Sequence, residues 1–422
     1  MLTVCVNLDC DNQYKEIFPM KKMLTADEAA TLLGVSTATL YSYVSRGMLD
    51  SVPSKNVRSK LYPRDQVLRL AARRKDGRQA GHTVEQAIDW GKPILESRIT
   101  LIEHGVIRYR GHDAMKLAQS ATLEQVAVIL WDDGKANMFD TNVMQITPAQ
   151  WRHMRQPFST FLPLERTAAL LAASAPLLIA AELPTNGAQL MQLVAAALLN
   201  TDVSMLPLHQ QCGNAWGLDD AATNLVRAAL VACADHELNV SAFTVRCVAS
   251  TGAPLPLALL AGLAALSGPR HGGESLRIRT LIDAALESDD MHGALKQHLA
   301  QPGIASGYGN RLPGFGHPLY PDGDPRGRML LQMLAAQETR HGNIAQLLEI
   351  GEAASALSGQ PVNVDFSLAA IEYAFGLARG TSQTLFALGR CAGWIAHAKE
   401  QASTGQLIRP RARYVGSFDF LD

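Results

Sequence analysis

Helical periodicity in Ala- and Leu-rich segments dominates the chain from Asp113 onward. These segments are separated by Pro- and Gly-containing stretches, for example 269–273, 302–316 and 321–327. Strand-like alternation after Gly111 is scarce. Since apolar residues at helical spacing favour helices over strands, we expect a mostly α body. Aromatic residues are only 6% of the 422 residues, so Ala and Leu must fill its core.

The sequence predicts four consecutive parts. We assign a loose tail to 1–19, a helix-turn-helix head to 20–79, a linker to 80–97 and the helical body to 98–422. The body opens with ITLIEHGVIRYRG, whose alternation is typical of a hairpin turning at His104 and Gly105. Met20 is a second plausible start site, because the residues before it show no periodicity.

The head contains the signals of two short helices. Thr25 and Glu28 have the spacing of a capping box, and apolar residues follow them. Gly34 ends this helix, and Ser36 caps a second helix expected over 37–46. A helix, a short Gly-containing turn and another helix form the helix-turn-helix outline. The residues that follow, 58–67, could form a small wing.

The head is basic although the whole chain is almost neutral. Between Met20 and Gln79 there are twelve Lys and Arg against five Asp and Glu, a net charge of +7, whereas the chain as a whole carries −1. A basic helix-turn-helix favours contact with DNA phosphates, with the second helix offered to the major groove. The same fold also serves protein contacts, so DNA and a protein surface both remain as partners.

Other features favour a cytoplasmic enzyme. The six cysteines lack the paired spacing of a zinc ribbon or a disulfide scaffold. The first residues carry acids and no long apolar run, so we expect no signal peptide. The uncharged stretch 247–269 has the length of a membrane span, but it contains Pro254 and Pro256. We therefore expect a buried helix there and no membrane contact.

Four loops combine an ionisable residue with small neighbours. They are ADHELN with His236, GPRHGG with His271, GFGHPLYPDGDPR with His317 and NVDF with Asp365. Taken singly, each histidine could be a capping or core residue. No two histidines among them share a helix at the spacing of zinc ligands, so we expect no metal site. The glycine-rich run lacks the Gly-Lys-Ser/Thr of a phosphate loop.

Taken together, these motifs identify a family. ADHELN, GPxHGG, GxGHxxYxxxDPR, NVD, FALGRxAGWxAH and RPRxxYxG occur in the order and rough spacing of citrate synthases. The body therefore resembles citrate synthase over 98–416. The resemblance implies an all-α homodimer with a large and a small domain, the latter at about 272–379. The head is similar to the DNA-binding domains of mercury-resistance-type regulators.

The resemblance implies the chemistry of three residues. Asp365 would be the base that deprotonates the methyl group of acetyl-CoA, and His271 would donate a hydrogen bond to the thioester carbonyl. His317 would polarise the ketone of oxaloacetate. A carboxylate base acting with a neutral donor suits a weakly acidic α-proton. The family needs no tightly bound cofactor, and acetyl-CoA is a substrate.

The remaining site residues would hold the substrates. His236, Arg326 and Arg390 match the family's oxaloacetate ligands, and Arg409 matches a residue contributed by the partner subunit. Guanidinium groups suit such ligands because they grip carboxylates bidentately. Alternatives remain: Arg390 could be an ordinary interface ion pair, and Arg411 could take the place of Arg409. The loop implied to receive the adenine of CoA comprises Leu312, Pro313, Gly314, Phe315 and Gly316.

Some positions depart from the family pattern. Arg270 replaces an apolar residue, the motif HGG is followed by Glu274 and Ser275 rather than by Ala-Asn, and Val362 stands in place of a proline. None of these changes removes a reacting group. We therefore expect an acyltransferase that makes citrate. The alternatives are 2-methylcitrate synthase, which uses propionyl-CoA, and a DNA-binding regulator whose body senses acyl-CoA.

Overall fold

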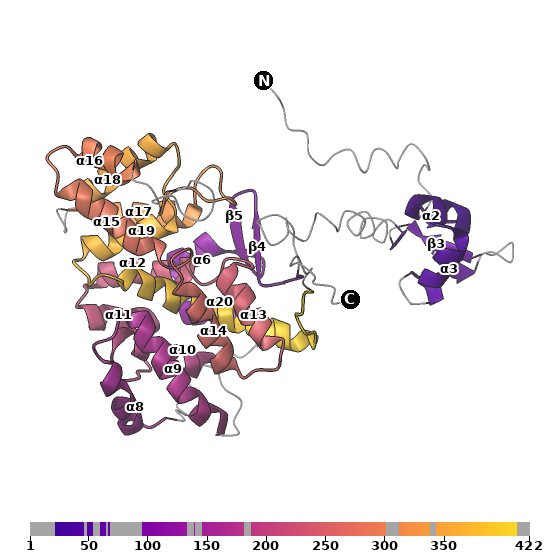
Figure 1. The fold of residues 1–422 in the computed structure, drawn as a ribbon, viewed down its shortest axis with the longest axis horizontal. Coiled ribbons are helices and arrows are strands. Elements are labelled where there is room, and N and C mark those ends of the chain that lie inside the picture. Colours follow the sequence, from indigo (N-terminus) through magenta and orange to yellow (C-terminus); the bar gives the residue numbers. More distant parts are fainter. Residues whose placement is uncertain are drawn as a thin grey trace, which may run out of the picture. The chain divides into compact units, whose positions relative to one another are not determined.

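The structure, a computed structural model, describes residues 22–45, 49–53, 60–64, 66–67, 95–132, 139, 146–180, 187–300, 312–337 and 343–411. The chain falls into two compact units, 1–96 and 97–422 (Figure 1). The exact bounds that we predicted for tail, head, linker and body stay predictions. The tail, Arg46, Arg58 and most of the linker lie outside the described residues.

The first unit contains the predicted pair of short helices. They are α2 (Ala26–Leu33) and α3 (Thr37–Ser45). The capping box forms, because the Thr25 amide donates to Glu28 Oε2 at 2.8 Å and the Glu28 amide donates to Thr25 Oγ1 at 3.3 Å. Gly34 adopts φ +60 and ends α2, a conformation that favours glycine. The helix-turn-helix is thus confirmed.

A small antiparallel sheet accompanies these helices. It consists of β1 (Met23–Leu24), β3 (Lys60–Pro63) and β2 (Val52–Pro53), with β3 in the centre. Leu24 pairs with Tyr62, and Val52 pairs with Leu61. Leu24, Leu40 and Tyr62 are fully buried and form the core of the unit. The expected wing at 58–67 thus contains β3, whereas its partner β2 lies before that range.

The body opens with the predicted hairpin. Strands β4 (Thr100–Glu103) and β5 (Val106–Tyr109) pair antiparallel, and β6 (His112–Asp113) extends the sheet. His104 and Gly105, both with positive φ, make the turn. Such a pair matches the twist of a two-residue hairpin.

Helices form the rest of the described body. In chain order they are α6 (Ala114–Ser120), α7 (Leu123–Trp131), α8 (Pro148–Arg155), the short 3-10 helix η1 (Gln156–Phe158), α9 (Pro163–Ala180), α10 (Gly187–Leu199), α11 (Leu208–Trp216), α12 (Asp220–Ala232), α13 (Val240–Ala249), α14 (Leu255–Leu266), α15 (Glu274–Leu286), α16 (Met291–Leu299), α17 (Pro325–Ala335), α18 (Ile344–Ser358), α19 (Val364–Ala374) and α20 (Thr381–Thr404). The mostly α expectation is confirmed. Among the described residues, no helix has the length and apolar character needed to cross a membrane.

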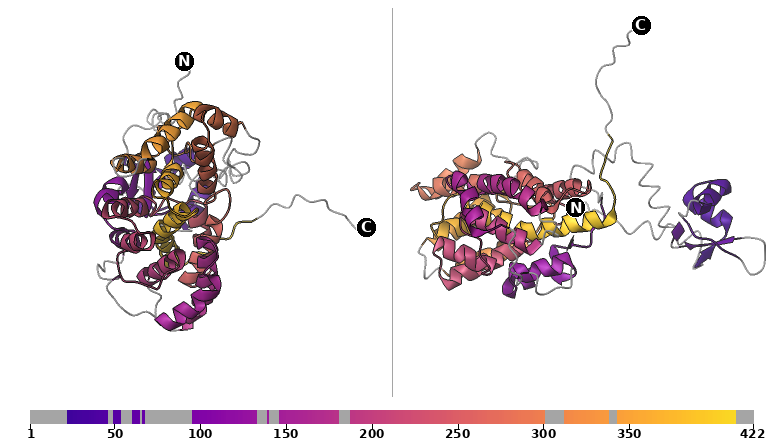
Figure 2. Two further views of the ribbon diagram at one scale, coloured as in Figure 1. Left: turned by 90° about the vertical axis from the view of Figure 1, so that its left-hand side faces the viewer. Right: turned by 90° about the horizontal axis from the view of Figure 1, so that it is seen from below.

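Helix α20 is the central element of the body. It spans 24 residues, is buried over most of its length, and contacts α7, α10, α12, α13, α14 and α19 (Figure 2). Two glycines let it approach the end of α12. A Cβ on Gly389 would lie 2.6 Å from the Leu230 carbonyl oxygen, and one on Gly393 would lie 2.5 Å from the Ala234 carbonyl oxygen. This close contact brings α20 against the segment that follows α12.

Candidate active site

Segments from five parts of the body carry the predicted site residues. His236 follows α12, His271 lies between α14 and α15, and His317 precedes α17. Arg326 and Asp365 occupy the first turns of α17 and α19, and these two helices pack together. Arg390 lies on α20.

Two of the predicted histidines meet around a tyrosine. The ring centroids of His236 and His317 are 4.9 Å apart, and that of Tyr320 lies 4.8 Å from His317. His236 Nε2 is 2.7 Å from the Tyr320 hydroxyl oxygen. Burial, reinforced by the charge of Arg326, holds the pKa of His236 well below its ordinary value. His236 is therefore neutral at neutral pH.

The backbone fixes the tautomer of His317 when its ring is neutral. The Leu319 amide donates a hydrogen bond to His317 Nδ1 at 3.2 Å. Because an accepting Nδ1 leaves the ring proton on the other nitrogen, Nε2 carries the N–H. This residue can therefore donate a hydrogen bond from Nε2.

One edge of the Arg326 guanidinium group is paired with the carboxylate of Asp324. Its Nε donates to Asp324 Oδ1 at 2.9 Å and its Nη2 donates to Asp324 Oδ2 at 2.8 Å. Both side chains are buried. Burial disfavours the charge of Arg326, but Asp324 more than compensates and raises its pKa. The site therefore holds a permanent cation whose remaining N–H groups are not used by Asp324.

Arg390 has spare hydrogen-bonding capacity. It is 1% exposed, its Nε donates to the Cys233 carbonyl oxygen at 2.9 Å, and its guanidinium carbon lies 4.7 Å from the centroid of the Phe386 ring. Among the described residues, its buried Nη2 has no hydrogen-bond partner. Leaving a buried charged group without a hydrogen bond costs free energy. This nitrogen is therefore available to donate a hydrogen bond to an anionic ligand.

Asp365 lies at the amino end of α19. Asn363 caps the helix, because its Oδ1 accepts hydrogen bonds from the Asp365 and Phe366 amides. Burial raises the pKa of the Asp365 carboxyl to about 6, although Arg326 opposes the rise. A carboxylate with a pKa close to neutrality is suited to accept a proton.

His271 occupies a neighbouring polar position. Its Nε2 lies 2.9 Å from the hydroxyl oxygen of Ser241, which also accepts a hydrogen bond from Trp394 Nε1 at 3.1 Å. Burial, with a contribution from Arg390, lowers the pKa of His271 to about 4. The imidazole is thus neutral, as the sequence analysis expected. Arg390 acts electrostatically on both His271 and Asp365.

Helices α17 and α19 touch through their backbones. A Cβ on Gly327 would lie 2.7 Å from the Asn363 carbonyl group. The Val364 amide donates to Asp324 Oδ2 at 3.1 Å, and the Ser367 hydroxyl donates to the Gly327 carbonyl oxygen at 2.9 Å. The first turns of the two helices are therefore joined into one block that carries Asp324, Arg326 and Asp365.

The predicted CoA loop lies beside the strand-like segment before α19. Within the loop formed by Leu312, Pro313, Gly314, Phe315 and Gly316, the Gly316 amide donates to the Pro361 carbonyl oxygen at 2.7 Å, and the Asn363 amide donates to the Gly314 carbonyl oxygen at 2.9 Å. Part of the loop's main chain is thus already paired. Its role in receiving adenine stays a prediction.

Arg409 stands apart from the other predicted residues. It is exposed, and the preceding Ile408 amide donates to Ser250 Oγ at the end of α13 at 3.1 Å. In the described residues, no contact joins Arg409 to the cluster of His236, Arg326 and Arg390.

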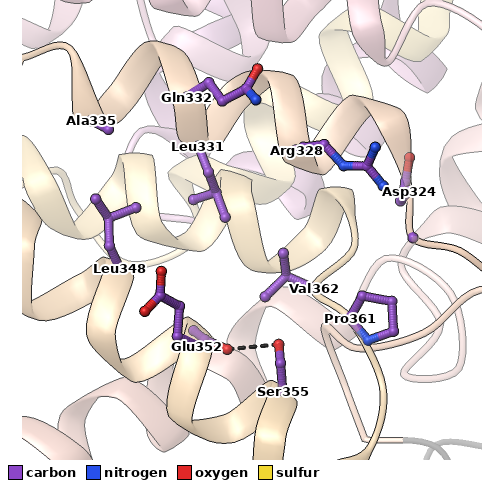
Figure 3. A pocket seen from close by; sticks show the side chains of 12 residues that line it. Asp324, Arg328, Leu331, Gln332, Ala335, Leu348, Glu352, Ser355, Pro361 and Val362 are labelled. Atoms are coloured by element: carbon purple, nitrogen blue, oxygen red, sulfur yellow. Dashed lines mark hydrogen bonds between the residues drawn. The ribbon is translucent and has the colours of Figure 1, made fainter.

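A separate pocket lies between α17 and α18 (Figure 3). Its volume is about 600 Å³. Leu331, Leu348 and Val362 contribute apolar surface, and Arg328 and Glu352 contribute charged groups. It shares Asp324 with the cluster but contains none of the predicted site residues.

Sequence reasoning did not single out two residues of the cluster. Tyr320 and Asp324 both stand within the motif that supplied His317 and Arg326, so their positions were visible as motif letters. Their roles depend on the fold, because only the turn before α17 brings the Tyr320 hydroxyl to His236.

Comparison with known proteins identifies the family. Residues 89–411 match the family model described as the citrate synthase C-terminal domain. The chain belongs to the citrate synthase family. Residues 23–75 match a model described as a helix-turn-helix domain. Among the residues that the structure describes, no group of three or more His, Cys, Asp and Glu side chains is arranged to hold a metal ion.

Individual citrate synthases show how far the similarity extends. A putative citrate synthase 2 of Mycobacterium tuberculosis is 34% identical over 191 residues, 44% of this chain and 49% of that protein. A 2-methylcitrate synthase of Shewanella oneidensis is 30% identical over 198 residues, 46% of this chain and 51% of that protein. The alignments thus span about half the length of these relatives.

A solved structure shows the same fold. It is the citrate synthase of Thermoplasma acidophilum in complex with carboxymethyl coenzyme A and oxaloacetate. The TM-score is 0.66 at 22% identity, and the match covers 79% of this chain and 97% of that chain.

Proposed function

We propose that the protein is a citrate synthase, an acyltransferase that condenses acetyl-CoA with oxaloacetate and hydrolyses citryl-CoA to citrate and CoA. The unpartnered Nη2 of buried Arg390 is the observation that carries this proposal. Together with the cation of Arg326, it provides two guanidinium groups for a small dianion. Oxaloacetate, with two carboxylates, fits this requirement.

The condensation step uses the neutral imidazole of His271 and the carboxylate of Asp365. The Asp365 carboxylate removes a proton from the methyl group of acetyl-CoA, while His271 donates a hydrogen bond from Nδ1 to the thioester oxygen. For this role the Ser241 hydroxyl, which donates to Asn239 Oδ1 at 2.8 Å, has to turn its proton to Nε2 of His271. The enolate carbon then bonds to the ketone carbon of oxaloacetate, and His317 Nε2–H donates a hydrogen bond to the oxygen that becomes the alkoxide. One proton, equal to the one that Asp365 removed, converts this alkoxide into the hydroxyl group of citryl-CoA. Water finally cleaves the thioester, releasing CoA as a thiol.

The proposed site is completed by a second subunit. Leu177 and Ile179 on α9 and Leu257 on α14 are 43%, 44% and 37% exposed, and α9 and α14 pack together. Such neighbouring apolar groups suit the interface of a homodimer. Arg409 would reach the partner's site, consistent with its exposure.

The loop Leu312–Gly316 would hold the CoA end of the substrate, and residues 272–379 would move as the small domain.

The head is proposed to bind DNA through α3. A helix-turn-helix in each subunit of a dimer would suit a two-fold site.

We also propose a cytoplasmic location. Cys212, Cys233, Cys247 and Cys391 are free thiols, as is usual in reducing compartments.

A second candidate activity is 2-methylcitrate synthesis, favoured by the similarity to the enzyme of Shewanella oneidensis. Its substrate, propionyl-CoA, has one more methylene, which changes binding by only about 1–3 kcal/mol. A thiol-release assay with oxaloacetate separates the possibilities. Faster release from acetyl-CoA supports citrate synthase, and faster release from propionyl-CoA supports the second candidate. Binding of acyl-CoA without thiol release would overturn both and favour a regulator that senses acyl-CoA.

A further inference from the structure

The segment that carries His236 is fixed on two sides. From α20, Arg390 Nε donates to the Cys233 carbonyl oxygen at 2.9 Å and the Gly393 amide donates to the Ala234 carbonyl oxygen at 3.0 Å. From β5, the Tyr109 hydroxyl lies 3.1 Å from the Asp235 carbonyl oxygen. These bonds hold the backbone up to the residue before His236.

The side chain of Asp235 adds a third fixation. Its Oδ1 lies 3.2 Å from His397 Nε2 on α20, at ion-pair distance but without the geometry of a hydrogen bond, and both side chains are 0% exposed. The Thr100 hydroxyl on β4 donates to Asp235 Oδ2 at 2.6 Å. Burial opposes the negative charge, but His397 and then Arg390 lower the pKa of Asp235. Asp235 is therefore a buried carboxylate held between a helix and a strand.

The backbone immediately after His236 is strained. Glu237 has φ 52, and a non-glycine residue in this region costs about 1–3 kcal/mol. Such a conformation persists only where the surroundings enforce it. Downstream, Asn239 Nδ2 donates to the His236 carbonyl oxygen at 3.3 Å. Upstream, the nearest fixed side chain is that of Asp235.

We propose that Asp235, paired with His397 and hydrogen-bonded to Thr100, is a positioning residue that maintains the strained turn at Glu237. Through this turn it orients the His236 ring toward the oxaloacetate site. The proposal deepens the proposed function, because it assumes that His236 contacts oxaloacetate. Asp235 itself touches no substrate.

The test compares Asp235→Asn with Glu400→Gln in the full-length protein. Glu400 lies about one turn after His397 on α20, pairs with Arg246 at 2.6 Å and accepts the Arg98 amide at 2.8 Å. It is therefore a second charge-paired acid in this region, and the described residues show no hydrogen bond or ion pair between it and the His236 segment. Since misplacing a binding group by about 1 Å can cost up to 10²-fold, we expect Asp235→Asn to raise KM for oxaloacetate about tenfold or more. KM for acyl-CoA should change less than threefold, about the scatter of such comparisons. Glu400→Gln should leave both KM values near wild type.

A second substitution tests the strain. Glycine adopts positive φ without penalty, so Glu237→Gly should keep the turn when the fixation by Asp235 is weakened. We expect the double variant Asp235→Asn/Glu237→Gly to recover most of the lost oxaloacetate affinity. Glu237→Gly alone serves as its reference. Without recovery, the turn at Glu237 is not what Asp235 maintains.

Crystal structures of the variants give a readout independent of activity. In Asp235→Asn we expect His236 Nε2 to move out of hydrogen-bond distance of the Tyr320 hydroxyl, and in Glu400→Gln we expect it to stay. An unchanged His236 ring in Asp235→Asn, with only a lower melting temperature, would show a purely structural role. If the wild-type protein releases thiol from neither acyl-CoA, the proposed function fails, and the crystal comparison still decides whether Asp235 positions His236.

Discussion

The carboxylate of Asp324 grips Arg326 through two parallel hydrogen bonds of 2.9 and 2.8 Å, although only Pro325 separates the two residues. The same carboxylate accepts the Val364 amide at the start of α19. One side chain therefore fixes a proposed substrate ligand and the helix that carries the proposed base.

Asp324→Asn should damage both stability and oxaloacetate binding. Removing one partner of a buried ion pair costs about 3–5 kcal/mol, and the freed Arg326 would lose its orientation. Urea denaturation and oxaloacetate titration measure the two effects. Asp322→Asn, at an exposed position two residues earlier, is the control and should be neutral. Wild-type stability in Asp324→Asn would contradict the expected role of the pair.

Asp365→Asn should abolish citrate formation while the protein stays folded. General bases contribute about 10² to 10⁴-fold, and His271→Ala should cause a loss of similar size. In the wild-type protein, burial raises the pKa of Asp365 to about 6, so kcat should fall as pH drops through about 6. Steady-state rates from pH 5 to 8 check this. A variant with more than about a tenth of the wild-type rate would refute the assignment of its residue.

Asp365→Asn should also stabilise the protein at alkaline pH. A carboxyl whose pKa rises on folding from 3.8 to about 6 favours the folded state only when it is protonated, and that contribution is lost as pH rises through 6. One pKa unit corresponds to about 1.4 kcal/mol, so Asp365→Asn should gain about 1–3 kcal/mol at pH 8. The gain should vanish below about pH 4. Denaturation at both pH values measures it; equal differences at the two would show that ionisation is not the cause.

Arg409 should act across the dimer. Homodimers of Arg409→Ala and of Asp365→Asn should each be inactive. After subunit exchange, each heterodimer should contain one intact site, so about a quarter of wild-type activity should return. Native mass spectrometry confirms the exchange. If exchange occurs and no activity returns, Arg409 serves its own chain's site or none.

DNA binding by the head should depend steeply on salt. The logarithm of the binding constant falls with the logarithm of salt concentration by about 0.9 per neutralised phosphate. Tyr41 is 53% exposed on α3, and Tyr41→Ala together with Arg46→Glu should weaken retention without changing thiol release. Deleting 20–79 should also spare catalysis. If the deletion destroys the dimer, and the intact protein does not bind DNA at low salt, the head is a structural or regulatory contact.

The sequence predicted the fold class and the hairpin because both follow local rules. Repeated helical spacing indicates helices, and the pair His104 and Gly105 indicates a two-residue turn. The helix-turn-helix was equally visible, since the capping box at Thr25 is a local motif.

The sequence predicted which residues carry the chemistry but not how they are held. The pairing of Asp235 with His397 joins positions that are far apart in the chain, so no local spacing reveals it. The unpartnered Nη2 of Arg390 could also not be foreseen, because it depends on what the surrounding backbone leaves unpaired. The domain bounds and the site roles stay predictions.

The close contact between Gly327 and Asn363 would have a kinetic consequence if the proposed small domain moves. Arg326 and Asp365 lie on one block, whereas His236 and Arg390 belong to the segment around α12 and α20. Movement of the block with Arg326 and Asp365 away from the segment with His236 and Arg390 would separate the residues that bind the product. The geometry within the block and within the segment would not change. Product could then leave and the next turnover begin with the proposed base already in position.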